Sequence, residues 1–240
     1  MKILITNDDS VNALQLIPLI RWCQKLGEVT AIVPKYEQSG KSQGIELHKA
    51  FAVEEVTPEP EIRILTVDST PADCIRYGVL GLKQTYDLVI SGINRGLNIG
   101  RDIMYSGTVS AVFEAGNLGV NAMAVSTSPA YYADAAREMD KIWDFMVKND
   151  LFRRNAMWNI NIPTGGSDEF RFTRQGGNYY SDQFKPEEND MYLPCGIDVF
   201  AKSDSDEFDT DAVLVDKVIS VMPLTLDRTN LELYKELKEL

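Results

Sequence analysis

The chain has 240 residues, of which 44% are hydrophobic and 25% are charged. This composition is close to that of globular domains and unlike that of disordered chains. The 36 acidic residues outnumber the 24 basic ones, and the formal net charge of −12 argues against salt-driven binding to extended nucleic acids. The single histidine, His48, excludes a zinc site built on three histidines.

The cysteine pattern and the hydropathy indicate the cellular compartment in which the protein is expected. Cys23, Cys74 and Cys195 are odd in number and widely spaced, so they form neither a disulfide framework nor a CxxC zinc motif, and we expect reduced thiols. No apolar run approaches the roughly 20 residues that span a bilayer. The N-terminal apolar stretch turns acidic too early for a signal peptide. We therefore expect a soluble, cytoplasmic protein.

The first 165 residues alternate between short apolar runs and segments with helical spacing. Residues 2–6, 11–26 and 29–33 form a predicted strand, helix and strand, with Pro18 kinking the helix or delaying its start. Further strands are predicted at 62–67, 88–93, 122–126 and 158–162, and further helices at 71–82, 108–118 and 133–147. The alternation predicts an α/β fold, a mostly parallel sheet with helices on both faces.

The pattern changes after Pro163, where glycine, aspartate, serine and aromatic residues become frequent. The predicted division is a core over 1–164, an extended excursion of hairpins or an arm over 165–225, and a C-terminal helix within 226–240. A strand is predicted at 213–222. The acidic residues Asp204, Asp206, Asp209 and Asp211 lack the glycine and closing glutamate of a calcium loop, so a solvated loop is expected.

Ligands of parallel α/β sheets bind beyond the carboxyl ends of the strands, so the strand ends carry the functional prediction. The first strand ends in Asn7-Asp8-Asp9-Ser10, a carboxylate pair suited to a hard divalent cation. The simpler alternative is that Asp9 or Ser10 caps the following helix. The loop at 35–44 contains Ser39 and Gly40 and can approach a ligand closely, although it lacks a Walker A spacing.

Two further segments are rich in glycine and polar residues. The strand at 88–93 runs into Asn94, two glycines and Asn98, and the segment Ser106-Gly107-Thr108 precedes a helix. Free N–H groups at a helix N-terminus favour a phosphate, while an ordinary cap by Ser106 or Thr108 is the alternative. Together, carboxylates for a metal and an anion site at a helix start indicate phosphoester hydrolysis.

Most of the chain carries short motifs in a fixed order. They are Ile3-Leu4-Ile5-Thr6-Asn7-Asp8-Asp9, Ser39-Gly40, Thr70-Pro71-Ala72-Asp73-Cys74, Ser91-Gly92-Ile93-Asn94-Arg95-Gly96-Leu97-Asn98, Tyr105-Ser106-Gly107-Thr108-Val109-Ser110-Ala111, Asn159-Ile160-Asn161-Ile162-Pro163, Thr210-Asp211 and Pro223-Leu224. In this order they resemble the SurE family, the survival protein E nucleotidases.

The resemblance implies a Rossmann-like core and a phosphatase that hydrolyses nucleoside 5′- or 3′-monophosphates with one divalent metal ion, Mg²⁺ or Mn²⁺. It also implies that 165–225 is an oligomerisation region exchanged between subunits of a dimer or tetramer. By position, the implied metal ligands are Asp8, Asp9, Ser39 and Asn94, with Asp8 and Asp9 catalytic, and the residues around the phosphate are Gly40, Asn98, Ser106, Gly107 and Thr108.

The sequence departs from the family pattern in three places. Ser10 replaces the usual glycine, Ala13-Leu14-Gln15 replaces Ala-Pro-Gly, and the loop at 41–46 is poorer in serine and threonine. A residue other than glycine tolerates a positive φ poorly, so the turn after Asp9 is in question. The alternatives are a nucleotide sensor without hydrolysis and a haloacid-dehalogenase-type phosphatase, whose D-x-D motif is missing from Asn7-Asp8-Asp9.

Overall fold

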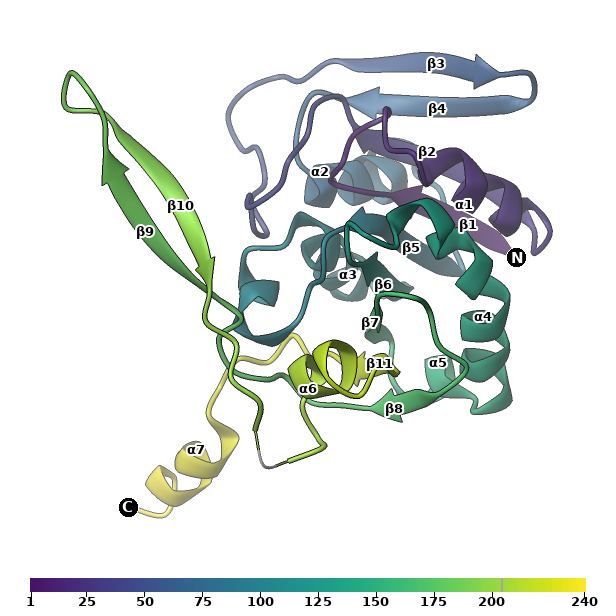
Figure 1. Ribbon diagram of the computed structural model, residues 1–240. Helices are drawn as coiled ribbons and strands as arrows, with labels where there is room; N and C mark the ends of the chain where they lie inside the picture. The colour runs from purple at the N-terminus through teal and green to yellow at the C-terminus, as the bar shows by residue number, and fades with distance from the viewer. Residues whose placement is uncertain (204) are drawn as a thin grey trace.

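The computed structural model describes residues 1–203 and 205–240, and in these residues a nine-stranded sheet forms the centre of the molecule (Figure 1). Its order is β3-β4-β2-β1-β5-β6-β7-β11-β8, and every neighbouring pair is parallel except β3–β4 and β7–β11. The strands are β1 (Lys2–Thr6), β2 (Glu28–Pro34), β3 (Val53–Glu59), β4 (Ile62–Val67), β5 (Leu88–Arg95), β6 (Asn121–Thr127), β7 (Met157–Ile162), β8 (Phe170–Phe172) and β11 (Ile219–Pro223). The predicted α/β fold with a mostly parallel sheet is confirmed.

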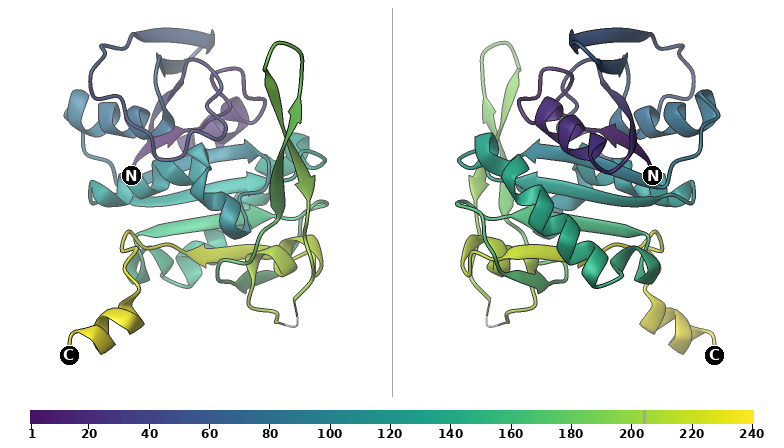
Figure 2. Two further views of the ribbon diagram at one scale, coloured as in Figure 1. Left: turned by 90° about the vertical axis from the view of Figure 1, so that its left-hand side faces the viewer. Right: turned by 90° about the vertical axis from the view of Figure 1, so that its right-hand side faces the viewer.

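Helices cover both faces of this sheet (Figure 2). Helices α1 and α4 share one apolar cluster with Ile3 and Ile5, and α2 and α3 share the other with Leu4. The helices are α1 (Leu16–Gln24), α2 (Pro71–Arg76), α3 (Gly107–Asn117), α4 (Met139–Lys148), α5 (Leu151–Arg154), α6 (Asp209–Leu214) and α7 (Leu231–Leu237), with a π-helical turn η1 (Tyr77–Gly81) and the 3₁₀ helices η2 (Gly100–Met104) and η3 (Tyr132–Glu138). Because β1 is buried on both faces, its apolar run needs no alternation with polar residues.

Two predicted elements differ from the structure. Helix α1 begins at Leu16 rather than at Val11, and Pro18 lies in its first turn, where a missing N–H costs no helical hydrogen bond. The strand predicted at 213–222 is confirmed only from Ile219 onward: α6 ends at Leu214, Lys217 has a φ of +57°, and β11 begins at Ile219. The apolar residues of this segment belong first to the end of α6 and then to β11. A short apolar run alone does not distinguish a helix from a strand.

The C-terminal third contributes both to the sheet and to two projections. Strands β8 and β11 belong to the main sheet, while the antiparallel hairpin β9 (Tyr180–Pro186) and β10 (Tyr192–Asp198) and the helix α7 extend away from the body (Figures 1 and 2). The exchange of residues 165–225 between subunits stays a prediction.

Several buried groups bear on earlier expectations. The three cysteines are free, and Cys23 and Cys74 are buried in α1 and α2.

The expectation of a solvated acidic loop is wrong for two of its residues. Asp206 is exposed, but Asp209 and Asp211 are buried at the start of α6. Asp204 lies outside the described residues. Within the described residues, every helix is too short or too polar to cross a bilayer.

Candidate active site

The chain turns sharply where β1 ends, and this turn brings two carboxyl groups to the edge of the sheet. Asp8 is buried and Asp9 is partly exposed. Ser10 has a φ of +70°, a left-handed conformation that residues other than glycine rarely adopt. The Asn7 side-chain amide donates to the Ser10 carbonyl over 2.9 Å, which fixes this turn. Helix α1 begins six residues later without a side-chain cap, so Asp9 and Ser10 do not cap it.

Asp8 lies against the N-terminus of α3. The Thr108 hydroxyl donates a hydrogen bond to Asp8 Oδ1 over 2.5 Å. A Cβ at Gly107 would lie 2.9 Å from the Asp8 Cβ, so only glycine allows this approach. Ser106 is the N-cap of α3, and its Oγ accepts from the Val109 N–H over 3.0 Å. The cap alternative is therefore correct for Ser106 and not for Thr108, which binds the carboxylate instead.

The two carboxyl groups resist ionisation. Burial raises the pKa of Asp8 to about 6, against the lowering effect of the Thr108 hydrogen bonds, and the neighbouring Asp9 raises it further. Burial also raises the pKa of Asp9, although the Arg95 N–H, 3.0 Å from Asp9 Oδ2, lowers it; Glu37 adds a third negative charge. The site therefore concentrates more negative charge than its protein neighbours compensate.

The loop after β2 is joined to this carboxylate pair. The Gln38 N–H donates to the Asp8 carbonyl over 2.8 Å, and the Ser42 N–H donates to the Tyr105 carbonyl over 3.0 Å. Between these attachments lie Ser39, whose hydroxyl donates to Glu37 over 3.0 Å, and Gly40, which has a φ of +72° and open space around its Cα. Ser39 and Gly40 are thus exposed and held between the end of β1 and the start of α3.

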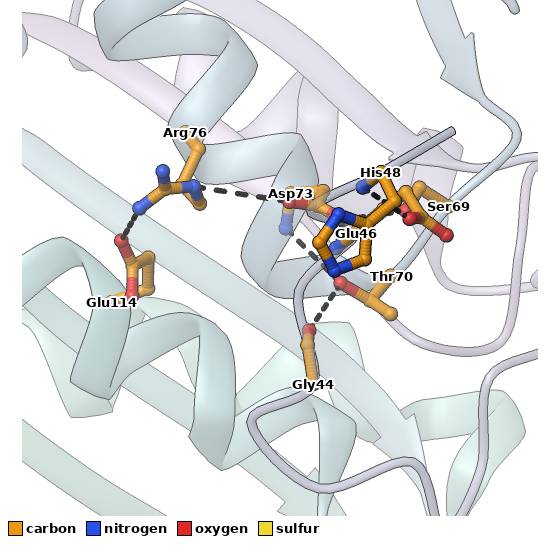
Figure 3. Close-up of polar contacts among 8 residues, drawn as sticks. All are labelled: Gly44, Glu46, His48, Ser69, Thr70, Asp73, Arg76 and Glu114. Atoms are coloured by element: carbon orange, nitrogen blue, oxygen red, sulfur yellow. Dashed lines mark hydrogen bonds and ion pairs between the residues drawn. The ribbon is translucent and has the colours of Figure 1, made fainter. Parts of the chain in front are cut away.

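The Thr70–Cys74 motif anchors the far end of the same loop (Figure 3). Asp73, buried in α2, accepts from the Glu46 N–H over 2.8 Å and from the Ser69 hydroxyl over 2.5 Å. Thr70 caps α2 and donates to the Gly44 carbonyl over 2.7 Å. On the next turn Arg76 pairs with Glu114 of α3 over 3.0 Å, so one polar cluster joins the loop, α2 and α3 (Figure 3). The sequence marked this motif only by resemblance, because its partners are distant in the chain.

A network of asparagines fixes the segment that follows β5. The Asn98 carbonyl accepts from the amides of Asn159 and Asn161, over 2.8 and 2.9 Å, and the Asn98 amide donates to the Ser126 hydroxyl over 2.7 Å. Asn94 is buried, and its amide donates to the Gly96 carbonyl over 2.9 Å, which leaves its oxygen available as a ligand. The motif at 159–163 thus has a structural role that its residue types alone did not indicate.

Asp209 is a residue near the site that the sequence analysis missed. Its carboxylate accepts three backbone N–H bonds, from Gly100 over 3.0 Å and from Gly176 and Thr210 over 2.8 Å. Burial nevertheless raises the pKa of Asp209 to about 6, since desolvation outweighs these bonds. Asp209 therefore ties the turn that follows Asn98 to α6 and to the approach to the hairpin.

The structure brings some of the predicted site residues together directly and others only into the same region. Asp9 and Ser39 line one pocket of about 590 Å³ with Glu37, Arg95 and Tyr132. Asp8, Gly107 and Thr108 are in contact beside it. Asn94 lies near the end of β5, and Asn98 and Gly40 lie on the two flanking loops. Among the described residues there is no cluster of three or more His, Cys, Asp or Glu side chains placed to hold a metal ion, so a bound cation would also need the serine and asparagine oxygens.

Comparisons with known proteins identify the family of this chain. A family model described as Survival protein SurE matches residues 3–182. A protein named 5′-nucleotidase SurE from Thermosipho melanesiensis is 36% identical over 251 residues, covering 100% of this chain and 97% of that protein. A relative of the same name from Anaeromyxobacter dehalogenans is 35% identical, covering 99% of this chain and 95% of its own length.

A solved structure is similar over its whole length. The crystal structure of the SurE protein from Aquifex aeolicus has a TM-score of 0.80 with this chain at 28% identity, and the match covers 100% of this chain and 99% of that one. The family model covers well over half of the sequence, and the relatives match it end to end. The chain therefore belongs to the SurE family.

Proposed function

We propose that this protein is a 5′-nucleotidase that hydrolyses nucleoside 5′-monophosphates to nucleoside and phosphate with a divalent metal ion, and that nucleoside 3′-monophosphates are a second substrate class. The observation that carries the proposal is the contact between the Asp8 carboxylate and the first turn of α3. This contact places a carboxylate suited to a cation beside a helix N-terminus suited to a phosphate. The names of the full-length relatives point to the same activity.

The residues at the end of β1 fit a hard cation. Two adjacent carboxylates with raised pKa values need compensating positive charge, since partly buried carboxylates are costly unless paired. The buried Asn7 Oδ1 beside them has no hydrogen-bond partner among the described residues. Asp8, Asp9, Ser39 and Asn94 would hold Mg²⁺ or Mn²⁺, whose chemistry when bound is to acidify water and neutralise phosphoryl charge.

The chain itself supplies the phosphate site. The first N–H groups of a helix lack partners within the helix and carry a partial positive charge. In α3 the Ser106 side chain already serves Val109, so the N–H of Gly107 is the group we assign to the phosphate oxygens. Asn98 and Gly40 would border the phosphate from the two flanking loops.

Asp9 is the group we assign to proton transfer. Its Oδ2 accepts the Arg95 N–H, and its carboxyl lines the open pocket. Oδ1 would accept the proton of the attacking water while Asp8, held by Thr108, keeps its orientation. In-line attack of the water oxygen on phosphorus would then break the bond to the nucleoside oxygen, which would take a proton from solvent and leave as the hydroxyl.

The sensor alternative depended on the departures from the family pattern. Ser10 retains the positive φ that glycine would have, so this departure does not favour loss of hydrolysis. We also propose that the protein is a homo-oligomer, a dimer or tetramer, and that it is cytoplasmic, where free thiols such as buried Cys23 and Cys74 remain reduced.

The test is phosphate release from a panel of nucleoside 5′- and 3′-monophosphates with Mn²⁺, Mg²⁺ or EDTA. We expect release with the metals and none with EDTA. Folded protein that releases no phosphate under any condition would contradict the proposal and favour the sensor, which would then show a nucleotide-dependent rise in melting temperature.

A further inference from the structure

A second pocket, of about 340 Å³, lies beside the candidate active site. Its volume is within the range of about 300–1,000 Å³ typical of small-molecule sites. The residues that matter for its chemistry are Tyr105, Asp102, Tyr179, Tyr180 and Asp182. Asp102 belongs to η2, and Tyr180 and Asp182 belong to the first part of β9, whose root lies next to the segment leading into α3 (Figure 1).

The residues that line the second pocket are neighbours in sequence of the residues proposed to bind the phosphate. Gly96 and Leu97, which line it, stand between the candidate residues Asn94 and Asn98. Tyr105, on another wall, directly precedes the N-cap Ser106. Pro129 lines both this pocket and the one containing Asp9. A nucleotide with its phosphate at the start of α3 can therefore place its base here.

Aromatic side chains give the pocket surfaces for stacking. The rings of Tyr179 and Tyr180 are 4.6 Å apart between centroids at an interplanar angle of 76°, an edge-to-face pair. Tyr180 is 47% exposed and Tyr105 is 56% exposed. These exposed ring faces are accessible to a ligand, and every nucleobase offers a flat face to stack on tyrosine.

Two carboxyl groups, those of Asp102 and Asp182, give the pocket negative charge and a preference for hydrogen-bond donors. Asp102 is half-buried, and both burial and the nearby Asp182 raise its pKa. A carboxylate only accepts hydrogen bonds, and it repels anions. The pocket therefore disfavours a second phosphate and favours a neutral base with donors on its edge. Guanine offers the adjacent donors N1–H and N2–H₂, whereas adenine has an acceptor at N1.

We propose that this pocket is the nucleobase subsite, that Tyr180 stacks on the base while Tyr179 supports it edge-on, and that Asp102 selects guanine over adenine. This inference rests on the proposed function, because that function puts a nucleotide phosphate at α3. It goes further in naming guanosine monophosphates as the preferred substrates and Asp102 as the residue that determines the preference.

The test is calorimetric binding of GMP, IMP and AMP in EDTA, where no turnover is expected. We expect GMP to bind about tenfold more tightly than AMP, as one good bidentate contact allows. IMP, which keeps N1–H and lacks the amino group, should fall between them. The conservative variant Asp102→Asn should bring GMP and AMP near parity, because its amide would face the guanine donors.

Two further variants separate binding from folding. Tyr180→Ala should weaken all three nucleotides about tenfold. Asp190→Asn, the same charge change in the exposed turn of the hairpin, should leave all affinities unchanged. Equal GMP and AMP affinities in the wild type, or an unchanged ratio in a folded Asp102→Asn protein, would overturn the subsite. Phosphate release with Mn²⁺, measured separately, decides the proposed function independently.

Discussion

At Asp8, burial and the adjacent carboxylate of Asp9 oppose ionisation, and a cation would reverse that balance. The Thr108 hydroxyl, one hundred residues away in the chain, is the polar neighbour that favours the charged form. The sequence predicted that Asp8 and Thr108 belong to one site. It could not predict their direct contact, because that depends on how closely α3 approaches the end of β1 at Gly107.

The raised pKa of Asp8 predicts a pH dependence of metal affinity. The carboxyl must lose its proton to bind a cation, and its pKa is about 6. Above pH 6 the group is already ionised, so affinity should be nearly constant there. Below pH 6 the apparent affinity for Mn²⁺ should fall by up to about tenfold per pH unit. Calorimetric titration with Mn²⁺ from pH 5 to 8 measures this, and an affinity that is flat down to pH 5 would refute it.

At the scale of elements, most strands and helices of the first 165 residues were predictable because they carry an apolar run or a helical periodicity of their own, and several end at a glycine or proline, such as Gly27, Pro34 and Gly119. The edge strands β3 and β8 were missed, since β3 is rich in glutamate and β8 has three residues. The start of α6 was misread for a different reason. From the sequence, Asp209 and Asp211 were expected to be exposed to solvent. The N–H groups that hydrogen-bond to the buried Asp209 carboxylate come together only in the folded chain.

We expect Asp209→Asn to destabilise the protein. An amide nitrogen would face at least one of the three N–H groups that the carboxylate now accepts, and an unpaired buried donor costs about 1–3 kcal/mol. The measurement is urea unfolding at pH 7. Asp206→Asn, at an exposed position nearby, is the control and should change stability by less than about 0.5 kcal/mol. Equal stabilities of the two variants would contradict the role assigned to Asp209.

At the scale of the whole molecule, apolar side chains gather on the parts that project from the body. On the hairpin, Phe184 is 67% exposed and Tyr192 is 65% exposed, and no residue of α7 is buried. Exposed apolar surface of this kind marks interaction sites. The sequence indicated an arm and a terminal helix. In the proposed homo-oligomer, the same surfaces of a second copy would cover them.

The oligomer proposal predicts that α7 contributes to assembly. Replacing Leu233 and Tyr234, 47% and 53% exposed, by aspartate would put two charges into a buried apolar contact. The double variant should shift the mass measured by light scattering towards the monomer. Glu236→Gln, on the same helix, should leave the mass unchanged. A wild-type protein that is monomeric at micromolar concentration would rule out the proposal.

The most direct test of the central claim is phosphate release from GMP by the wild type and by Asp9→Asn, each with Mn²⁺ and with EDTA. The account predicts that EDTA stops release by the wild type. It also predicts that Asp9→Asn, with a circular dichroism spectrum like that of the wild type, loses about a hundredfold or more of kcat/KM. Release that continues in EDTA, or an Asp9→Asn protein that keeps wild-type turnover with Mn²⁺, would contradict the metal-dependent nucleotidase described here.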